Sequence, residues 1–195
     1  MIKAIIFDCF GVLVGDGFDV TYRTSGGDPI KDTVFIEEIL EKANRAQIST
    51  EEFRRQICQK LGISAEKYTE TTNKTETINY ELLDYIKTIR PKYKTAILSN
   101  VNRGGVERRI PKPLIEECFD AVVVSGDVGY IKPEREIYEL TAERLGVKLD
   151  ECVFIDDRQG YVAPAVEYGM MGIVYQDFAQ MKTDLERLIT PVSDN

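Results

Sequence analysis

Five short apolar runs recur along the chain, and most of them are separated by stretches in which apolar residues have helical spacing. The runs cover residues 4–7, 94–98, 121–124, 152–155 and 172–175. Runs of this length are typical of strands that are buried on both faces of a parallel sheet. Strands that alternate with helices predict an α/β fold with a doubly wound parallel sheet.

Residues 15–75 interrupt this alternation, because no strand pattern occurs within them. The first part, residues 15–29, contains several glycines and a proline, which predicts an irregular segment. Apolar spacing then predicts helices in the rest of the segment. The predicted organisation is therefore an α/β core made of residues 1–14 and 76–195, with a small helical insertion after the first strand.

The 195 residues carry a net charge of −8. This acidic balance argues against a general nucleic-acid or anionic-membrane surface, so we expect neither kind of partner. No apolar run is long enough to span a bilayer, and the amino terminus lacks the pattern of a secretory signal. We therefore expect a cytoplasmic protein. The sequence contains no indication of the oligomeric state.

The chain has no histidine and four scattered cysteines. Without histidine, Ser-His-Asp and Cys-His nucleophile systems and histidine zinc sites are excluded. The cysteines form no C-x-x-C pair, so we predict small buried residues rather than zinc ligands or disulfides. Acid–base chemistry must fall to Asp, Glu, Lys, Tyr or Cys.

Polar side chains follow four of the predicted strands at, or just beyond, their carboxyl ends. They are Asp8, Ser99, Asn100, Lys132, Asp156 and Asp157. In a parallel α/β sheet these ends meet at one edge, where ligands bind. Three carboxylates suit a hard cation such as Mg²⁺, and a lysine with hydroxyl and amide groups suits a phosphate. Each residue alone is explained as well by a turn or a helix cap, so the prediction depends on their joint placement.

Four motifs at these positions resemble those of the haloacid dehalogenase superfamily of hydrolases. They are Phe7-Asp8-Cys9-Phe10-Gly11-Val12-Leu13, Leu98-Ser99-Asn100, Lys132-Pro133 and Phe154-Ile155-Asp156-Asp157. The chain looks most like the branch that holds sugar-phosphate phosphatases and the phosphatase domain of soluble epoxide hydrolases. The resemblance implies a Rossmann-like core, a helical cap over residues 15–75, Mg²⁺ as cofactor and a small phosphorylated substrate.

The resemblance also implies the roles of individual residues. Asp8 would be the catalytic nucleophile, which forms an aspartyl-phosphate, and also a metal ligand. The backbone carbonyl of Phe10 and the carboxylate of Asp157 would complete the metal site, with Asp156 in support. Ser99, Asn100 and Lys132 would bind the phosphoryl group, and Lys132 would thereby be catalytic.

Phe10 departs from the family pattern, because phosphatases of this family usually carry a second aspartate there. That aspartate protonates the leaving group and later activates water, and losing such a group typically costs about 10²–10⁴-fold in rate. Three explanations stay open: a leaving group that needs no proton, an acid supplied by Asp16 or a cap residue, or feeble catalysis.

The function predicted from the sequence is a Mg²⁺-dependent phosphatase for a small phosphorylated metabolite. The first alternative is a catalytically weak or silent ligand-binding or regulatory protein, which the phenylalanine at position 10 motivates. The lesser alternative is a 2-haloacid dehalogenase, because an aromatic residue is also common at that position in those enzymes. Dehalogenases use no metal, and the Asp156–Asp157 pair favours a cation.

Overall fold

The computed structural model describes residues 1–190, and its centre is a five-stranded sheet in the order β3-β2-β1-β4-β5. The strands are β1 (Ala4–Phe7), β2 (Lys94–Ser99), β3 (Ala121–Val124), β4 (Cys152–Asp156) and β5 (Met171–Val174). All paired strands are parallel, and β1 lies between β2 and β4. The predicted α/β fold with a doubly wound parallel sheet is therefore confirmed.

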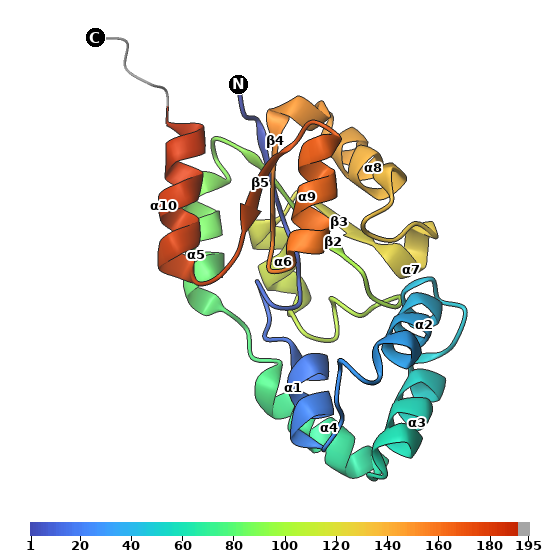
Figure 1. Cartoon of the computed structure of the whole chain (residues 1–195). Helices are drawn as coiled ribbons and strands as arrows, with labels where there is room; N and C mark the ends of the chain where they lie inside the picture. The colour runs from blue at the N-terminus through green and yellow to red at the C-terminus, as the bar shows by residue number, and fades with distance from the viewer. Residues whose placement is uncertain (191–195) are drawn as a thin grey trace.

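Helices cover both faces of this sheet (Figure 1). The core helices are α5 (Tyr80–Ile89), α6 (Lys112–Cys118), the short α7 (Ser125–Val128), α8 (Arg135–Leu145), α9 (Gln159–Glu167) and α10 (Phe178–Ile189), with a 3₁₀ turn, η1, at Leu149–Glu151. Successive side chains of a strand point to opposite faces, so β1 contributes to two apolar clusters. Ile5 and Phe7 pack with α5, α6 and α10, and Ile6 packs with α8 and α9.

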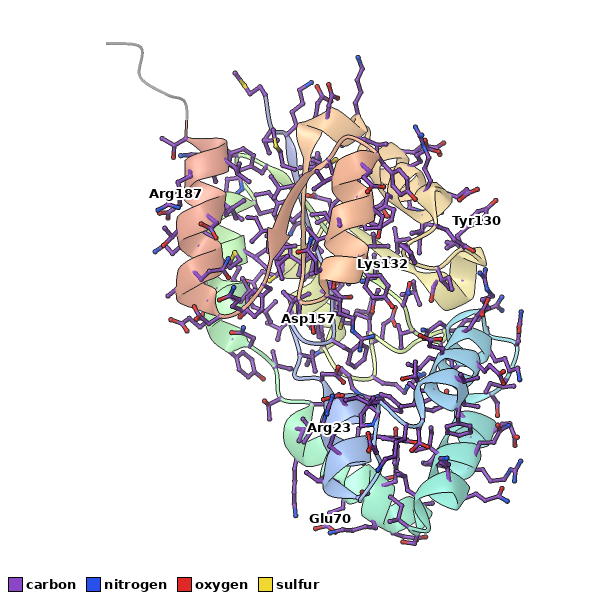
Figure 2. All side chains as sticks on the ribbon, viewed as in Figure 1. Arg23, Glu70, Tyr130, Lys132, Asp157 and Arg187 are labelled. Atoms are coloured by element: carbon purple, nitrogen blue, oxygen red, sulfur yellow. The ribbon has the colours of Figure 1, made fainter. Side chains whose placement is uncertain are left out.

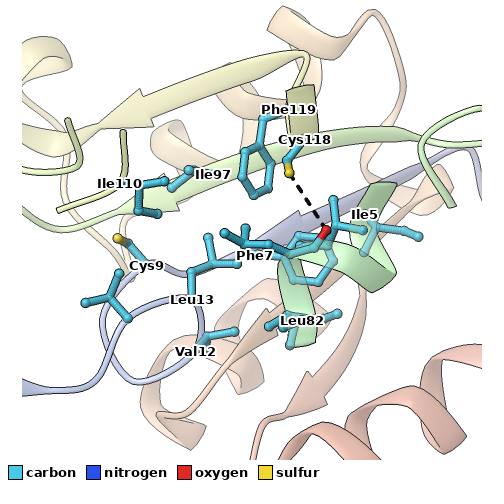
Figure 3. Packing of buried hydrophobic residues seen from close by; sticks show 14 of the residues in the cluster. Ile5, Phe7, Cys9, Val12, Leu13, Leu82, Ile97, Ile110, Cys118 and Phe119 are labelled. Carbon is cyan, nitrogen blue, oxygen red and sulfur yellow. Dashed lines mark hydrogen bonds between the residues drawn. The ribbon is translucent and has the colours of Figure 1, made fainter. Parts of the chain in front are cut away.

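The first of these clusters is shown at close range in Figure 3. Phe7 and Phe119 meet edge to face with ring centroids 6.4 Å apart. Cys118 donates a weak hydrogen bond from Sγ to the carbonyl oxygen of Leu83 at 3.8 Å. All four cysteines are buried and unpaired, as the sequence predicts.

Four helices between β1 and α5 form a second body below the sheet edge (Figure 1). We call them the insertion helices: α1 (Gly17–Thr24), α2 (Thr33–Asn44), α3 (Thr50–Leu61) and α4 (Ala65–Thr75). They bury their own apolar cluster, which includes Ile39, Ile57 and Tyr68. This cluster is separate from the two on the sheet, so the insertion helices hold together largely through contacts with one another.

The expectation of an irregular segment over residues 15–29 is wrong for α1. Asp16 caps that helix by accepting a hydrogen bond from the backbone N–H of Asp19 at 3.0 Å. Tyr22 is fully buried, and its hydroxyl donates to Asp32 Oδ2 at 2.9 Å. Of the glycines that suggested a loop, Gly17 begins the helix and the others lie outside it. The cap at Asp16 and the burial of Tyr22 stabilise the helix.

The two chain segments that connect the insertion helices to the sheet run side by side. The backbone N–H of Gly15 donates to the carbonyl oxygen of Thr77 at 3.1 Å, and Val14 forms a bridge with Ile78. The predicted core range extends to residue 195, and its last five residues lie outside the described part of the chain. Within residues 1–190, no helix has both the length and the apolar character needed to cross a membrane.

Candidate active site

Asp8 and Lys132 form the centre of the site at the carboxyl edge of the sheet. Asp8 follows β1, and its backbone N–H donates to the carbonyl oxygen of Ile155 at 2.8 Å. Lys132 Nζ donates to Asp8 Oδ1 at 2.8 Å and to Asp156 Oδ2 at 2.6 Å. The lysine side chain is only 1% exposed. Residues from three distant parts of the sequence therefore share one buried ion-pair network.

The two adjacent aspartates at the end of β4 have different surroundings. Asp156 is fully buried and uses both oxygens, since Oδ1 accepts from the backbone N–H of Arg158 at 2.8 Å and Oδ2 accepts from Lys132. Asp157 Oδ1 is buried and has no hydrogen-bond partner in the described residues. Figure 2 shows Asp157 and Lys132 near each other at the sheet edge that faces the insertion helices.

Asp8, Asp156 and Asp157 together have the geometry of a cation site. One oxygen from each carboxylate can be chosen so that all three lie within 4.8 Å of one another. Gly11 allows this approach, because its φ is +92° and a Cβ there would lie 2.5 Å from Cγ of Asp157. Carboxylate oxygens at this spacing suit Mg²⁺, and the partnerless Asp157 oxygen is a fitting donor for it.

The electrostatics of the carboxylate cluster also favour a bound cation. Burial, reinforced by the neighbouring Asp156 carboxylate, raises the pKa of Asp157 to about 6. Burial also raises the pKa of Asp8, although the Lys132 ammonium opposes that shift. Burial alone would lower the pKa of Lys132, but the Asp8 and Asp156 carboxylates reverse this and hold it above its ordinary value. Three crowded carboxylates face a single lysine in this cluster, so further positive charge would stabilise their ionised forms.

Ser99 and Asn100 lie beside this cluster and line the same cavity as Asp8 and Lys132. Asn100 clamps the lysine backbone, since its Nδ2 donates to the carbonyl oxygen of Lys132 at 2.9 Å and its Oδ1 accepts from the Lys132 N–H at 2.8 Å. Ser99 Oγ is buried without a partner in the described residues. The serine hydroxyl is thus free for a ligand, while the asparagine amide positions Lys132.

A cavity of about 810 Å³ extends from this edge to the insertion helices. On the core side it includes Phe10, whose ring lies 6.0 Å from the guanidinium of Arg109. Arg109 forms an ion pair with Glu76, another cavity residue. Sequence reasoning did not identify Arg109 or Glu76 individually, because neither belongs to a strand-end motif and they are far apart in the chain.

Arg158 and Asp16 form a second pair on the cavity wall. Arg158 Nη2 lies 3.3 Å from Asp16 Oδ2, and the Arg158 guanidinium lies 5.9 Å from the ring centroid of Tyr161. Tyr161 also lies beneath the Lys132 ammonium, with Nζ 5.0 Å from its centroid. Arg158 directly follows the Asp156–Asp157 pair in the sequence, and that position was the signal that could have identified it.

Comparisons with known proteins bear on the family and the fold of this chain. D-ribitol-5-phosphate phosphatase from Bacteroides thetaiotaomicron is 26% identical over 203 residues, which cover 95% of this chain and 97% of the relative. Bifunctional epoxide hydrolase 2 from Rattus norvegicus is 36% identical over 74 residues, which cover 38% of this chain and only 13% of that longer protein. A solved structure, described as a predicted HAD-like family hydrolase from Porphyromonas gingivalis, has a TM-score of 0.76 at 25% identity and covers 98% of this chain and 100% of its own.

The family model described as haloacid dehalogenase-like hydrolase matches residues 2–167, which include all four strand-end motifs. The resemblance inferred from those motifs is therefore confirmed. One relative that aligns with this chain along nearly its whole length is a phosphatase. This protein belongs to the haloacid dehalogenase-like hydrolase family.

Proposed function

We propose that this hydrolase is a Mg²⁺-dependent phosphatase that cleaves a small phosphorylated metabolite through an aspartyl-phosphate on Asp8. The observation that carries the proposal is the convergence of Asp8, Asp156 and Asp157 within 4.8 Å, with Lys132 Nζ 2.8 Å from Asp8. The phosphatase that aligns along nearly the whole chain supports the same reaction class.

The metal would be held by Asp8, by Asp157 and by the backbone carbonyl of Phe10. Asp157 offers a buried oxygen that has no partner in the part of the chain that the structure describes, whereas both oxygens of Asp156 already accept hydrogen bonds. This difference supports Asp157 as the direct ligand and Asp156 as the residue that orients Lys132. When bound, Mg²⁺ would supply positive charge that offsets the repulsion between the carboxylates and a phosphate dianion.

The protein's own residues would then carry out an in-line displacement. An Asp8 oxygen forms a bond to phosphorus while the bond from phosphorus to the leaving oxygen breaks. Lys132 and the Ser99 hydroxyl donate hydrogen bonds to the transferring phosphoryl oxygens, and Asn100 keeps Lys132 in place. Water then attacks the phosphorus, releases inorganic phosphate and restores the Asp8 carboxylate.

The insertion helices would act as the cap, with residues 15–75 as its extent. The cavity of about 810 Å³ is lined by core residues such as Asp8 and by insertion residues such as Phe18, Phe53 and Tyr68. A cavity of this size is larger than a phosphate group requires. We therefore propose that the insertion helices contact the organic part of the substrate and determine which metabolite is accepted.

The test is phosphate release by the purified protein from a broad panel of phosphorylated metabolites, with Mg²⁺ and with a chelator. We expect turnover that requires Mg²⁺ and that Asp8→Asn abolishes, while circular dichroism shows a folded variant. Turnover that survives Asp8→Asn would refute the aspartyl-phosphate. A panel from which the wild-type protein releases no phosphate would refute the phosphatase.

Phe10 favours a second candidate, a protein of this family that binds a phosphorylated ligand without turning it over. Calorimetry with inorganic phosphate and Mg²⁺ would then show binding, while the panel shows no release of phosphate. A third outcome, halide release from 2-haloacids without metal, would indicate a dehalogenase. Asp157 Oδ1 argues against that outcome, because a site without metal leaves this buried oxygen without any partner in the described residues.

A further inference from the structure

Position 10 cannot transfer a proton, because a phenyl ring has no titratable group. Cleavage of an alkyl phosphate nevertheless needs a proton on the leaving oxygen, and hydrolysis of the aspartyl-phosphate needs a base for the attacking water. For an alkyl phosphate substrate, another group on the cavity wall must serve this purpose.

One carboxyl group on the cavity wall, that of Glu76, is linked to the Phe10 ring by a single intervening residue. Arg109 lies over the Phe10 ring at 6.0 Å and forms an ion pair with Glu76. All three residues line the cavity that contains Asp8. Glu76 lies near the segment that follows β1. The carbonyl oxygen of the next residue, Thr77, accepts a hydrogen bond from the backbone N–H of Gly15 in that segment.

Glu76 is also held firmly in this position. Its side chain is 7% exposed, and it lies against Gly17, where a Cβ would come within 2.5 Å of Glu76 Cγ. Burial raises the pKa of Glu76, and the hydrogen bond and charge of Arg109 oppose that shift. The other charged groups that influence it are Asp16 and Arg108. A buried carboxyl group in these surroundings is suited to alternate between acid and base.

Other acids on the cavity wall are less suited to this role. Asp16 Oδ1 accepts the capping hydrogen bond from the Asp19 N–H and Oδ2 accepts one from Arg158, so both of its oxygens are already engaged. Glu37 and Glu51 line the cavity but are exposed to solvent. Among these wall carboxylates, Glu76 combines burial with a connection to Phe10.

We propose that Glu76 is the proton carrier of this phosphatase and that Arg109 is the positioning residue that holds it toward the leaving group. The inference rests on the proposed function and adds a catalytic residue to it. It also favours a phosphate monoester of an alcohol as the substrate, because an acyl phosphate needs no such acid.

In the first step, the Asp8 oxygen bonds to phosphorus, the bond to the substrate oxygen breaks, and protonated Glu76 gives its proton to that oxygen. The alcohol leaves, and Glu76 becomes a carboxylate. In the second step, Glu76 accepts a proton from water as the water oxygen bonds to phosphorus and the bond to Asp8 breaks. The sum is one phosphate ester and one water converted to one alcohol and inorganic phosphate.

The experiment compares two leaving groups in single-turnover reactions with excess enzyme and Mg²⁺. An alkyl phosphate needs a proton for its first step, whereas 4-nitrophenyl phosphate does not. We expect Glu76→Gln to slow alcohol release from the alkyl phosphate by about 100-fold. Release of 4-nitrophenolate in the first turnover should stay close to the wild-type rate. Glu143→Gln, an acid-to-amide change at an exposed position that does not line the cavity, should leave both rates near the wild type.

A rescue variant separates a proton role from a structural one. Phe10→Asp in the Glu76→Gln background should restore part of the alkyl-phosphate rate, because it returns a carboxyl group to position 10. Equal slowing of both leaving groups by Glu76→Gln would overturn the inference, and so would a leaving-group-selective loss caused by Asp16→Asn instead. Should Glu76→Gln fail to fold, Glu76→Asp must show the selective loss, and equal losses in that variant would overturn the inference.

The same data distinguish this inference from the proposed function. Wild-type turnover that depends on Asp8 but is unchanged by Glu76→Gln would overturn the role of Glu76 alone. Absence of wild-type turnover on both substrates, or turnover that survives Asp8→Asn, would overturn the phosphatase itself.

Discussion

The two walls of the cavity are built in different ways. On the core wall, Asp8, Lys132 and Asp156 are buried and joined by hydrogen bonds of 2.8 and 2.6 Å. On the opposite wall, the insertion helices present half-buried side chains such as Phe18 and Phe53. The core wall is therefore fixed by charge pairing, and the insertion wall by apolar packing. A division of this kind lets one side keep its chemistry while the other changes its ligand.

Mutations in the two walls should also have different effects on stability and on turnover. Removing the partner of a buried charge destabilises the folded state, and at this site it also removes a group that the proposed reaction needs. A residue lost from the insertion cluster, which is separate from the sheet clusters, should loosen the insertion helices first. Four predictions test this contrast, from the largest expected effect to the smallest.

Lys132→Met should have the largest effect, because it leaves Asp8 and Asp156 buried without their shared cation. We expect the free energy of unfolding to fall by about 3–5 kcal/mol, as for other broken buried ion pairs. Turnover should fall by at least about 10³-fold, since the same ammonium would bind the phosphoryl group. Urea unfolding and phosphate release measure the two effects. The exposed Lys92→Met is the matched control, and an equal loss there would contradict the prediction.

Ile57→Ala should weaken the insertion helices and spare the sheet. Ile57 is fully buried in the insertion cluster, so its truncation should cost about 2–5 kcal/mol of local stability. Native-state hydrogen exchange should show faster exchange in α1–α4, while amides of β1 and β4 keep their protection. Uniform loss of protection across both regions would show that the two walls unfold as one unit.

Asp157→Asn should weaken Mg²⁺ binding by about 10–100-fold and leave the fold intact. The amide keeps one oxygen but loses the negative charge of a half-buried side chain whose Oδ1 has no partner within residues 1–190. Calorimetric titration with Mg²⁺ measures the change, and the exposed Asp150→Asn serves as the control. Unchanged Mg²⁺ affinity in Asp157→Asn would remove Asp157 from the ligand set.

The pH dependence of stability should show the smallest effect. The pKa of Asp157 is raised from 3.8 to about 6, so the metal-free folded state binds more protons than the unfolded state between these values. The contribution of this group is present at low pH and is lost as pH rises through about 6. Mg²⁺ replaces that proton, so it should raise the melting temperature more at about pH 7.5 than at about pH 5. A pH-independent Mg²⁺ effect would contradict this prediction, and Asp157→Asn should reduce the difference.

Much of the core was predictable from the sequence, because a buried strand leaves an apolar run and its carboxyl end leaves a polar residue. The runs that include Ile6 and Phe154 therefore predicted β1 and β4, and Asp8 and Asp156 marked the sheet edge. Helix α1 was not predicted, because no such local signal marks it in the sequence. Its stability depends on the cap at Asp16 and on burial of Tyr22 against distant residues, which local composition does not reveal.

The candidate site was predictable only where its residues belong to strand-end motifs. Asn100 was expected to bind phosphate, and the structure shows that its side chain holds the backbone of Lys132. Glu76 and Arg109 have no motif, since Glu76 directly follows α4 and Arg109 lies in the connection between β2 and α6. Their pairing across 33 residues depends on how the insertion helices return to the core.

The sequence by itself determined the parallel sheet, the strand-end carboxylates and the lack of an acid at position 10. These features follow from residue type and spacing, which local physics translates directly into strands and their ends. Only the tertiary structure decided that Asp157 Oδ1 has no partner within residues 1–190, and that Arg109 links the buried Glu76 side chain to the Phe10 ring. Such facts arise from contacts between distant segments, and no local pattern encodes the geometry at which those segments meet.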